Sequence, residues 1–173
     1  NLLSESARVQ SRGDYHTDER ILACLSSSPS NAKIIRTAAR MARAFRGTFT
    51  ALYVETPNTA AMSDDDKKRL QDNKRLAQQL GAAIETSYGD DVPYQIAEFA
   101  RLSGISKIVI GRSTIAQKNI FSKPTLTERL ISSVPNLDIH VIPDASTGTS
   151  YQEKKSKAQV DAMPLRDVLK SIV

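Results

Sequence analysis

The chain has 173 residues, a formal net charge of +5, a single Cys and two His. A composition of 40% hydrophobic and 25% charged residues is typical of a soluble globular protein, and the length suits one domain with tails. One Cys excludes an internal disulfide and, with only two His, argues against a zinc site. No apolar run approaches the ~20 residues of a membrane span, and no signal peptide is recognisable, which favours a cytosolic location.

The composition divides the chain into three regions. Residues 1–17 are polar and weakly periodic, so we interpret them as a linker. Residues 18–144 carry the patterns of strands and helices and form the predicted domain. Residues 145–173 are polar and charged and end in a short apolar patch, which is too short to span a membrane.

The first half of the predicted domain reads as strand, helix, strand. Residues 20–26 are an apolar run of the kind found in buried parallel strands. Ser28 is the expected cap of a helix that has Pro29 at its first position, runs to about residue 46 and ends at Gly47. A second strand is predicted over 48–55.

The second half continues the same alternation. Ser63, followed by three Asp, is the expected cap of a long helix, and Asp91 begins another. Thr125 and Glu128 have the spacing of a capping box. We expect helices over 63–81, 91–104 and 125–135, and strands over 83–88, 106–111 and 137–142. Strands that alternate with helices predict an α/β fold with an open, doubly wound, five-stranded parallel sheet.

Ligands of such sheets bind beyond the carboxyl ends of the strands, where the strand order reverses. The first loop at this edge, 26–30, holds four serines at the mouth of a helix. Hydroxyls, exposed N–H groups and the helix dipole favour a phosphate there. Simple helix capping with a solvated turn is the other interpretation, and the pattern does not decide between them.

Strand alternation places Phe49, Ala51 and Tyr53 on one face of the second strand. Tyr53, nearest the carboxyl edge, offers a ring on which a base can stack, or is a core aromatic with its hydroxyl at the rim. For Phe49 we prefer the core interpretation. In the turn after the fourth strand, Gly111 permits close backbone approach and Arg112 can fork onto a phosphate, unless the turn is merely tight and its Arg solvated.

Nothing in the sequence supports catalysis. Cys24 has no His nearby and is expected in the core, and His140 is expected on a sheet face. Five cations and no acid occupy residues 29–46, and most of them share one helical stripe. We interpret this stripe as a solvated outer face, with an acidic docking partner as the alternative. The five are Lys33, Arg36, Arg40, Arg43 and Arg46.

Three segments, RILACLSSSPSNAKIIRTAARMARAFRGTFTALYVE, ISKIVIGRST and LTERLISSVPNLDIHVIPD, resemble the universal-stress-protein-like domain of KdpD-type potassium-sensing histidine kinases. The resemblance covers about residues 18–144. It implies a Rossmann-like universal stress protein fold with sheet order 3-2-1-4-5. This order would place the first and fourth strands at the point where the order reverses.

Two motifs of this family can be compared with the chain. ATP-binding universal stress proteins carry G-x2-G-x9-G-S/T after the fourth strand; Gly111 matches, but Thr114 and Pro124 replace the later glycines, which argues against ATP. Members that respond to cyclic di-AMP carry S-x-S, twenty residues, then F-T-A-x-Y. Residues 26–53 match every specified position of that motif.

The resemblance therefore implies a cyclic di-AMP site at the carboxyl ends of strands one, two and four. A phosphate would meet Ser26 and Ser28, an adenine would lie beside Tyr53, and Arg112 and Ser113 would approach from the opposite side. The full set of expected ligand-binding residues is Ser26, Ser28, Ser30, Phe49, Thr50, Ala51, Tyr53, Gly111, Arg112 and Ser113. No catalytic residue, metal or cofactor is expected.

The same resemblance implies a regulatory, non-enzymatic domain on the cytoplasmic side of a membrane-bound sensor histidine kinase. Residues 145–173 would lead toward a membrane helix of that parent protein. The remainder of the kinase, a stand-alone universal stress protein or a second copy are the expected protein partners, and nucleic acid is not. Two alternatives stay open: an ATP- or AMP-binding stress-type domain, and a ligand-free protein-interaction module.

Overall fold

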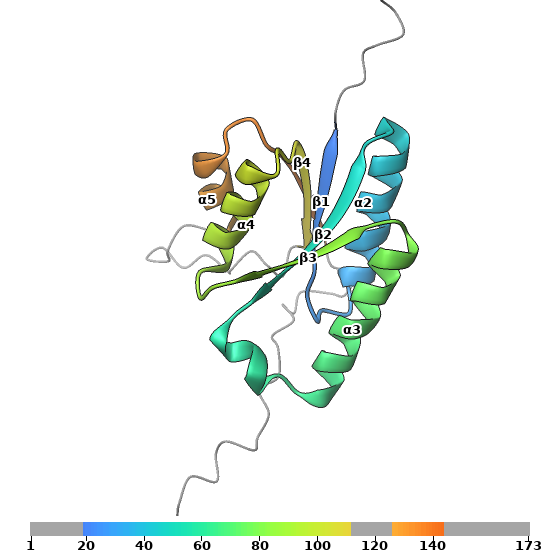
Figure 1. The fold of residues 1–173 in the computed structure, drawn as a ribbon, viewed down its shortest axis with the longest axis vertical. Coiled ribbons are helices and arrows are strands. Elements are labelled where there is room, and N and C mark those ends of the chain that lie inside the picture. The colour runs from blue at the N-terminus through green and yellow to red at the C-terminus, as the bar shows by residue number, and fades with distance from the viewer. Residues whose placement is uncertain (1–18, 112–125, 144–173) are drawn as a thin grey trace, which may run out of the picture.

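The computed structural model describes residues 19–111 and 126–143, which form a sheet flanked by helices (Figure 1). All the predicted strands and helices are present, with their ends within about two residues of expectation. A 3-10 helix, η1, was not predicted. The elements are β1 (Arg20–Cys24), α2 (Asn31–Phe45), β2 (Thr48–Glu55), η1 (Pro57–Ala61), α3 (Asp64–Gln79), β3 (Ala83–Tyr88), α4 (Val92–Leu102), β4 (Lys107–Gly111), α5 (Leu126–Ser133) and β5 (Asp138–Ile142).

The five strands form one parallel sheet in the order β3-β2-β1-β4-β5, which confirms the predicted fold class and strand order. Ala23 of β1 lies opposite Ala51 of β2 on one side and Val109 of β4 on the other. The chain builds outward from β1 to β3, then crosses to the far side of β1 to form β4. The order therefore reverses between β1 and β4, where ligands of such sheets bind.

Successive residues of each strand point to opposite faces, so the sheet supports two apolar layers. In β1, Ile21 packs with α2 and α3, whereas its neighbour Leu22 packs with α4 and α5. Figure 1 shows the two helix pairs on opposite sides of the sheet. Both residues are fully buried, as expected for a central parallel strand covered on both faces.

The start of α2 differs from the prediction. The helix begins at Asn31 with Ser30 as its N-cap, so Ser28 is not the cap and Pro29 is not the first helical residue. The reason is that Ser28 forms a preceding turn, in which its carbonyl accepts from the N–H of Asn31 at 3.1 Å and its hydroxyl bonds to that of Ser30 at 2.8 Å. By contrast, Ser63 and Asp91 cap α3 and α4 as predicted.

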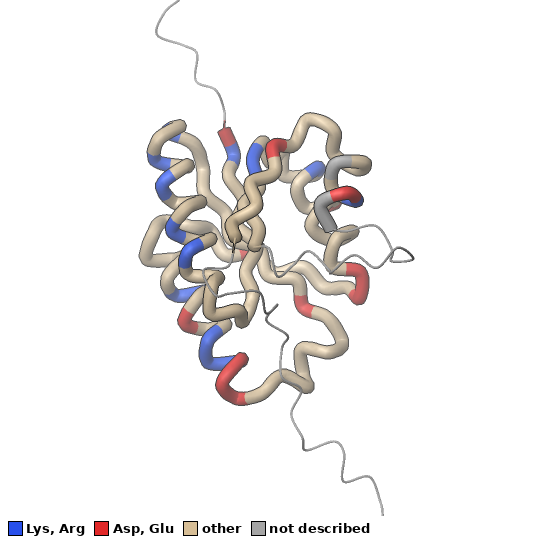
Figure 2. The backbone as a smooth tube through the Cα atoms, turned by 180° about the vertical axis from the view of Figure 1, so that it is seen from behind, with Lys and Arg blue, Asp and Glu red and all other residues tan. Residues whose placement is uncertain are grey.

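The outer face of α2 carries the predicted basic stripe. Lys33, Arg36, Arg40, Arg43 and Arg46 are all exposed. None of them forms an ion pair with a residue in the described ranges, and Figure 2 shows Lys and Arg positions following this helix. The stripe is therefore exposed, as both the solvated face and the docking alternative require.

Several predictions lie outside the described residues: the linker over 1–17, the capping role of Thr125, and the tail over 145–173. Within the described ranges, no helix has the length and apolar character needed to cross a membrane.

Candidate functional site

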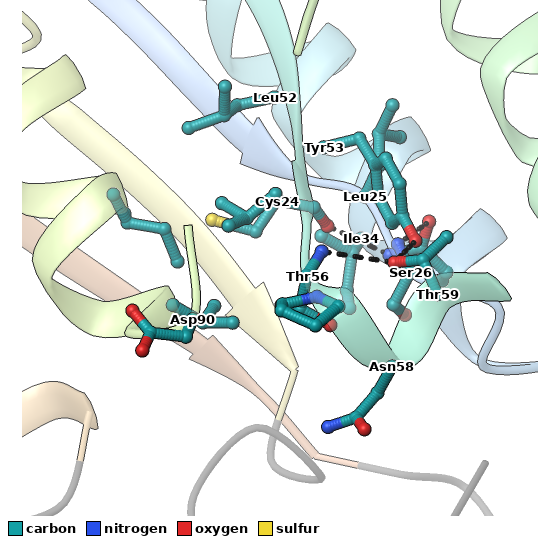
Figure 3. Close-up of a pocket in the computed structure, with 15 residues that line it drawn as sticks. Cys24, Leu25, Ser26, Ile34, Leu52, Tyr53, Thr56, Asn58, Thr59 and Asp90 are labelled. Atoms are coloured by element: carbon teal, nitrogen blue, oxygen red, sulfur yellow. Dashed lines mark hydrogen bonds between the residues drawn. The ribbon is translucent and has the colours of Figure 1, made fainter. Parts of the chain in front are cut away.

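A cavity of about 470 Å³ opens at the carboxyl ends of β1 and β2, where η1, the start of α2 and the start of α4 approach one another (Figure 3). This volume lies within the range of small-molecule sites. Its walls are mixed and contain both apolar and polar side chains. The lining residues are Cys24, Leu25, Ser26, Asn31, Ile34, Leu52, Tyr53, Val54, Thr56, Pro57, Asn58, Thr59, Asp90, Val92 and Ile96.

Two of the predicted site residues, Ser26 and Tyr53, line this cavity together. Their proximity follows from the strand register. Cys24 is paired with Leu52, and beyond that pair the Leu25 N–H donates to the Leu52 carbonyl at 2.8 Å. The residues that follow on each strand therefore emerge side by side at the carboxyl edge.

Tyr53 combines the two interpretations that its sequence position left open. Its side chain is only 7% exposed and packs in the apolar layer beneath α2 and α3. Its hydroxyl reaches the rim, where it lies 3.1 Å from Thr59 Oγ1 and donates to Met62 Sδ at 3.7 Å. The Lys74 ammonium lies 4.7 Å from the ring centroid. Tyr53 therefore enters the cavity as an anchored wall rather than as a free stacking platform.

In the serine loop, residues 26–30, two backbone N–H groups are hydrogen-bonded to serine hydroxyls of the same loop. The N–H of Ser28 donates to Ser26 Oγ at 3.2 Å, and the N–H of Ser30 donates to Ser28 Oγ at 3.3 Å. These N–H groups are thus not the exposed donors that the sequence interpretation placed there. The Ser26 hydroxyl accepts one of these bonds but donates to no described residue. Its O–H is therefore still available as a hydrogen-bond donor to a ligand.

Asn31 and Asn73 hold the loop from below, and sequence reasoning missed both. Asn31 is 1% exposed; its Nδ2 donates to the Cys24 carbonyl at 2.9 Å and its Oδ1 accepts from the Ser26 N–H at 3.2 Å. Asn73 of α3 donates through Nδ2 to the Ser26 carbonyl at 2.9 Å. Both backbone groups of Ser26 are therefore fixed by buried amides.

Asp66 and Arg69 of α3 extend this set of contacts, which together with Asn31 and Asn73 we call the frame beneath the serine loop. Asp66 is 2% exposed and accepts from the Ser63 hydroxyl at 2.9 Å and from Arg69 Nη1 at 3.0 Å. The same Arg69 nitrogen donates to the Ser27 carbonyl at 3.0 Å. The only signal in the sequence is the spacing of Asp66, Arg69 and Asn73, which places them on one helical face. Polar residues at this spacing are also usual on an exposed helix face, so the signal does not indicate burial.

The other predicted site residues lie elsewhere. Phe49 and Ala51 are buried between the sheet and α2 and α3, which agrees with the core interpretation of Phe49. Thr50 is half-buried in β2, and Gly111 is buried at the end of β4. Arg112 and Ser113 are outside the described residues.

Among the residues that the structure describes, the titratable side chains in the cavity wall are those of Cys24, Tyr53 and Asp90. Burial raises the pKa of the Cys24 thiol to about 12, so the thiolate is scarce near neutral pH. Cys24 was expected in the core; it is half-buried and reaches the cavity wall. Among the described residues, Asp90 is the one carboxylate in the wall, and its neighbour Asp91 is held by Arg129 of α5 at 2.7 and 2.8 Å. Across the described residues, no three His, Cys, Asp or Glu side chains gather as a metal site.

Comparison with curated proteins identifies relatives along most of the chain. It is 35% identical over 164 residues to the sensor protein KdpD of Clostridium acetobutylicum, an alignment that covers 91% of this chain and 18% of that protein. It is 31% identical over 124 residues to the sensor protein KdpD of Escherichia coli, covering 72% of this chain and 14% of that protein. The chain thus spans less than a fifth of the length of either relative. No family model matches it.

Solved structures with this fold include universal stress proteins. One, crystallised in complex with cAMP, superposes with a TM-score of 0.55 at 12% identity and covers 72% of this chain and 96% of that one. Another, from Burkholderia pseudomallei, superposes with a TM-score of 0.50 at 18% identity and covers 73% and 97%. At these identities the likeness establishes the fold alone, and it agrees with the observed strand order.

Proposed function

Because this chain belongs to the universal-stress-protein-like domains of KdpD-type sensor proteins, we propose that it is a regulatory domain that binds cyclic di-AMP. The ligand enters the cavity at the carboxyl ends of β1 and β2, where Ser26 and Tyr53 lie in the wall. Gly111, which is not part of that wall, is proposed with Arg112 and Ser113 to contact a part of the ligand beyond the cavity. Occupancy is passed to a sensor histidine kinase in the membrane, of which this domain is a cytoplasmic part. The domain itself performs no chemistry.

One observation carries this proposal. The two ends of the spaced serine and Phe-Thr-Ala-x-Tyr motif, Ser26 and Tyr53, line one cavity although 26 residues separate them in the chain. Ser26 offers a hydroxyl donor to a phosphate, and Tyr53 offers a rigid aromatic wall to an adenine. A protein with the same fold is solved with cAMP, so the fold accommodates a cyclic adenine nucleotide.

Calorimetric titration of the purified chain with cyclic di-AMP tests the proposal. We expect saturable heat with cyclic di-AMP and a rise in melting temperature that ATP does not produce. A shift with ATP instead selects the stress-type nucleotide-binding alternative. Neither heat nor shift at high micromolar ligand, with folded protein, would leave the protein-interaction module as the function.

Ser26→Ala and Tyr53→Phe are the variants that report on the cavity. Ser26→Ala removes a hydroxyl donor, and we expect a loss of binding of about tenfold, since a hydrogen bond to a charged group contributes about 1.5–3 kcal/mol. Tyr53→Phe keeps the ring and removes the hydroxyl, so binding is expected to persist. Thr37→Ala, on α2 away from the cavity, is the matched control and should bind as the parent chain does.

A further inference from the structure

The polar side chains of the cavity wall differ in how much hydrogen-bonding capacity they retain. Asn31, Tyr53 and Thr59 are engaged with neighbouring groups. Asn58 and Asp90 also line the cavity, but their side chains make no hydrogen bond or ion pair with any residue that the structure describes. Both are exposed at the mouth. Their full capacity is therefore directed to solvent or to a ligand.

Asp90 lies across the cavity from the motif residues, whereas Asn58 precedes Thr59, whose hydroxyl lies 3.1 Å from that of Tyr53. Figure 3 shows Tyr53 and Ser26 on one side of the cavity, Asp90 on the other, and Asn58 at the mouth. Asn58 is carried by η1, directly after β2, and Asp90 by the loop between β3 and α4. A ligand that fills the cavity therefore meets the motif residues at one end and Asp90 at the other.

The charge of Asp90 limits what can lie beside it. No Lys or Arg among the described residues lines the cavity, whereas the neighbouring Asp91 is neutralised by its bidentate pair with Arg129. An unneutralised carboxylate repels a phosphate and can only accept hydrogen bonds. In a nucleotide, the groups that donate to such an acceptor are the sugar hydroxyls and the amino and ring N–H groups of the base.

Asn58 has complementary chemistry. Its amide donates and accepts side by side, which matches the adjacent amino donor and ring-nitrogen acceptor of adenine. Guanine presents a different order of donors and acceptors on its edges, so the same amide discriminates between the two purines.

We infer that Asp90 accepts a hydrogen bond from a ribose 2′-hydroxyl of the ligand and that Asn58 reads the adenine edge. The inference rests on the proposed function and gives the ligand a direction, with a phosphate toward Ser26 and a sugar toward Asp90. In a 3′,5′-linked cyclic dinucleotide the 2′-hydroxyl is the free sugar hydroxyl. The cavity is thus selective for a ribonucleotide that contains adenine.

The test compares three ligands by calorimetry: cyclic di-AMP, its 2′-deoxy analogue and cyclic di-GMP. The parent chain is expected to bind cyclic di-AMP about tenfold more tightly than either of the other two. Asp90→Ala should abolish the preference over the 2′-deoxy analogue, and Asp90→Asn, which keeps an acceptor, should retain part of it. Asn58→Ala should abolish the preference over cyclic di-GMP but keep the preference for ribose.

Asp65→Ala is the control for the loss of a negative charge, because Asp65 is exposed on α3 outside the cavity. If Asp90→Ala and Asp90→Asn change the affinity for both adenine ligands equally, Asp90 acts only through its charge and the inference is wrong while the proposed function stands. If the parent chain does not bind cyclic di-AMP at all, the proposed function fails and this inference fails with it.

Discussion

The carboxamide of Asn31 joins the end of β1 to the start of α2, because one side chain bonds to both the Cys24 carbonyl and the Ser26 N–H. Sequence reasoning correctly placed Ser26 and Tyr53 at the carboxyl ends of the strands but missed Asn31. An Asn after a run of serines reads as a surface residue of a helix, and only its burial against the loop reveals its role. Its contribution is tertiary, so no local pattern carries it.

Gly47 shows a second residue whose role is tertiary. The sequence predicts that α2 ends at Gly47, yet the C-cap is Arg46, which adopts a left-handed conformation with φ of 53°. Gly47 is required instead because a Cβ there would overlap the Glu19 carbonyl oxygen, which accepts from the Thr48 N–H at 2.9 Å. The chain enters β2 through a gap that has no room for a side chain.

We therefore expect Gly47→Ala to reduce the free energy of unfolding by about 1–3 kcal/mol, the usual cost of forcing extra volume into a packed site. Urea denaturation measures the change. Gly81→Ala is an informative comparison, because nothing lies within 4 Å of its added Cβ and its φ of +94° alone imposes a cost. A Gly47→Ala protein as stable as the parent would show that the Glu19 backbone moves freely.

At the scale of elements, sequence patterns located all five strands. The central strands β1 and β4 are apolar runs because both of their faces are covered, whereas the edge strands β3 and β5 are shorter on apolar residues and largely exposed. The sequence patterns did not predict η1, and they did not predict which polar residues of α3 are buried. The inner face of α3 buries Asp66 and Asn73 alongside Leu70 and Ala77, so its polar residues hide the apolar stripe on which periodicity depends. The frame beneath the serine loop could not be predicted for the same reason.

The outer face of α2 offers a prediction about charge. Arg36 is followed by Arg40 one turn later and preceded by Lys33, and like charges at this spacing destabilise a helix by about 0.2–0.5 kcal/mol per pair. Arg36→Glu converts both repulsions into attractions. Because each of the two pairs changes from repulsion to attraction, we expect the variant to gain about 0.8–2 kcal/mol in free energy of unfolding at low salt.

Urea denaturation at low and at 1 M NaCl measures this effect. Arg36→Gln, which removes the charge without reversing it, should give about half the gain. High salt should remove most of the difference, since the pairs are exposed and screened. A loss of stability would mean that Arg36 has a favourable partner after all, and a gain that is independent of salt would mean that the gain does not come from charge repulsion.

At the scale of the whole molecule, the two ends of the parallel strands differ in chemistry. The cavity lies at the carboxyl ends, whereas a charged cluster around Lys107 lies at the amino ends. The Lys107 ammonium lies 2.6 Å from Asp138 and 3.9 Å from Glu19, and it also lies 5.1 Å from the Phe45 ring centroid. These contacts tie β4 to β5, to the residue before β1 and to the end of α2.

This cluster makes stability depend on pH. The hydrogen bond from Lys107 and its charge hold the pKa of Asp138 below its ordinary value, so the folded state favours the ionised carboxyl. The stabilisation is present above the unfolded-state pKa of ~4 and is lost as the pH falls through the lower, folded-state value. Glu98 behaves in the same direction, because the hydrogen bond from Arg101 lowers its pKa.

Asp138→Asn removes the titrating group and keeps its shape, so the free energy of unfolding should fall near neutral pH and decline less steeply below about pH 5 than in the parent chain. Chemical denaturation at a series of pH values measures the slope. Lys107→Gln is the matched variant, since it removes the cation that bonds to Asp138 and keeps the carboxyl, and its slope should flatten in the same range. Equal slopes for all three proteins would mean that Lys107 and Asp138 attract each other no more in the folded chain than in the unfolded one. The strands β4 and β5 would then be held by their backbone bonds and the apolar layer alone.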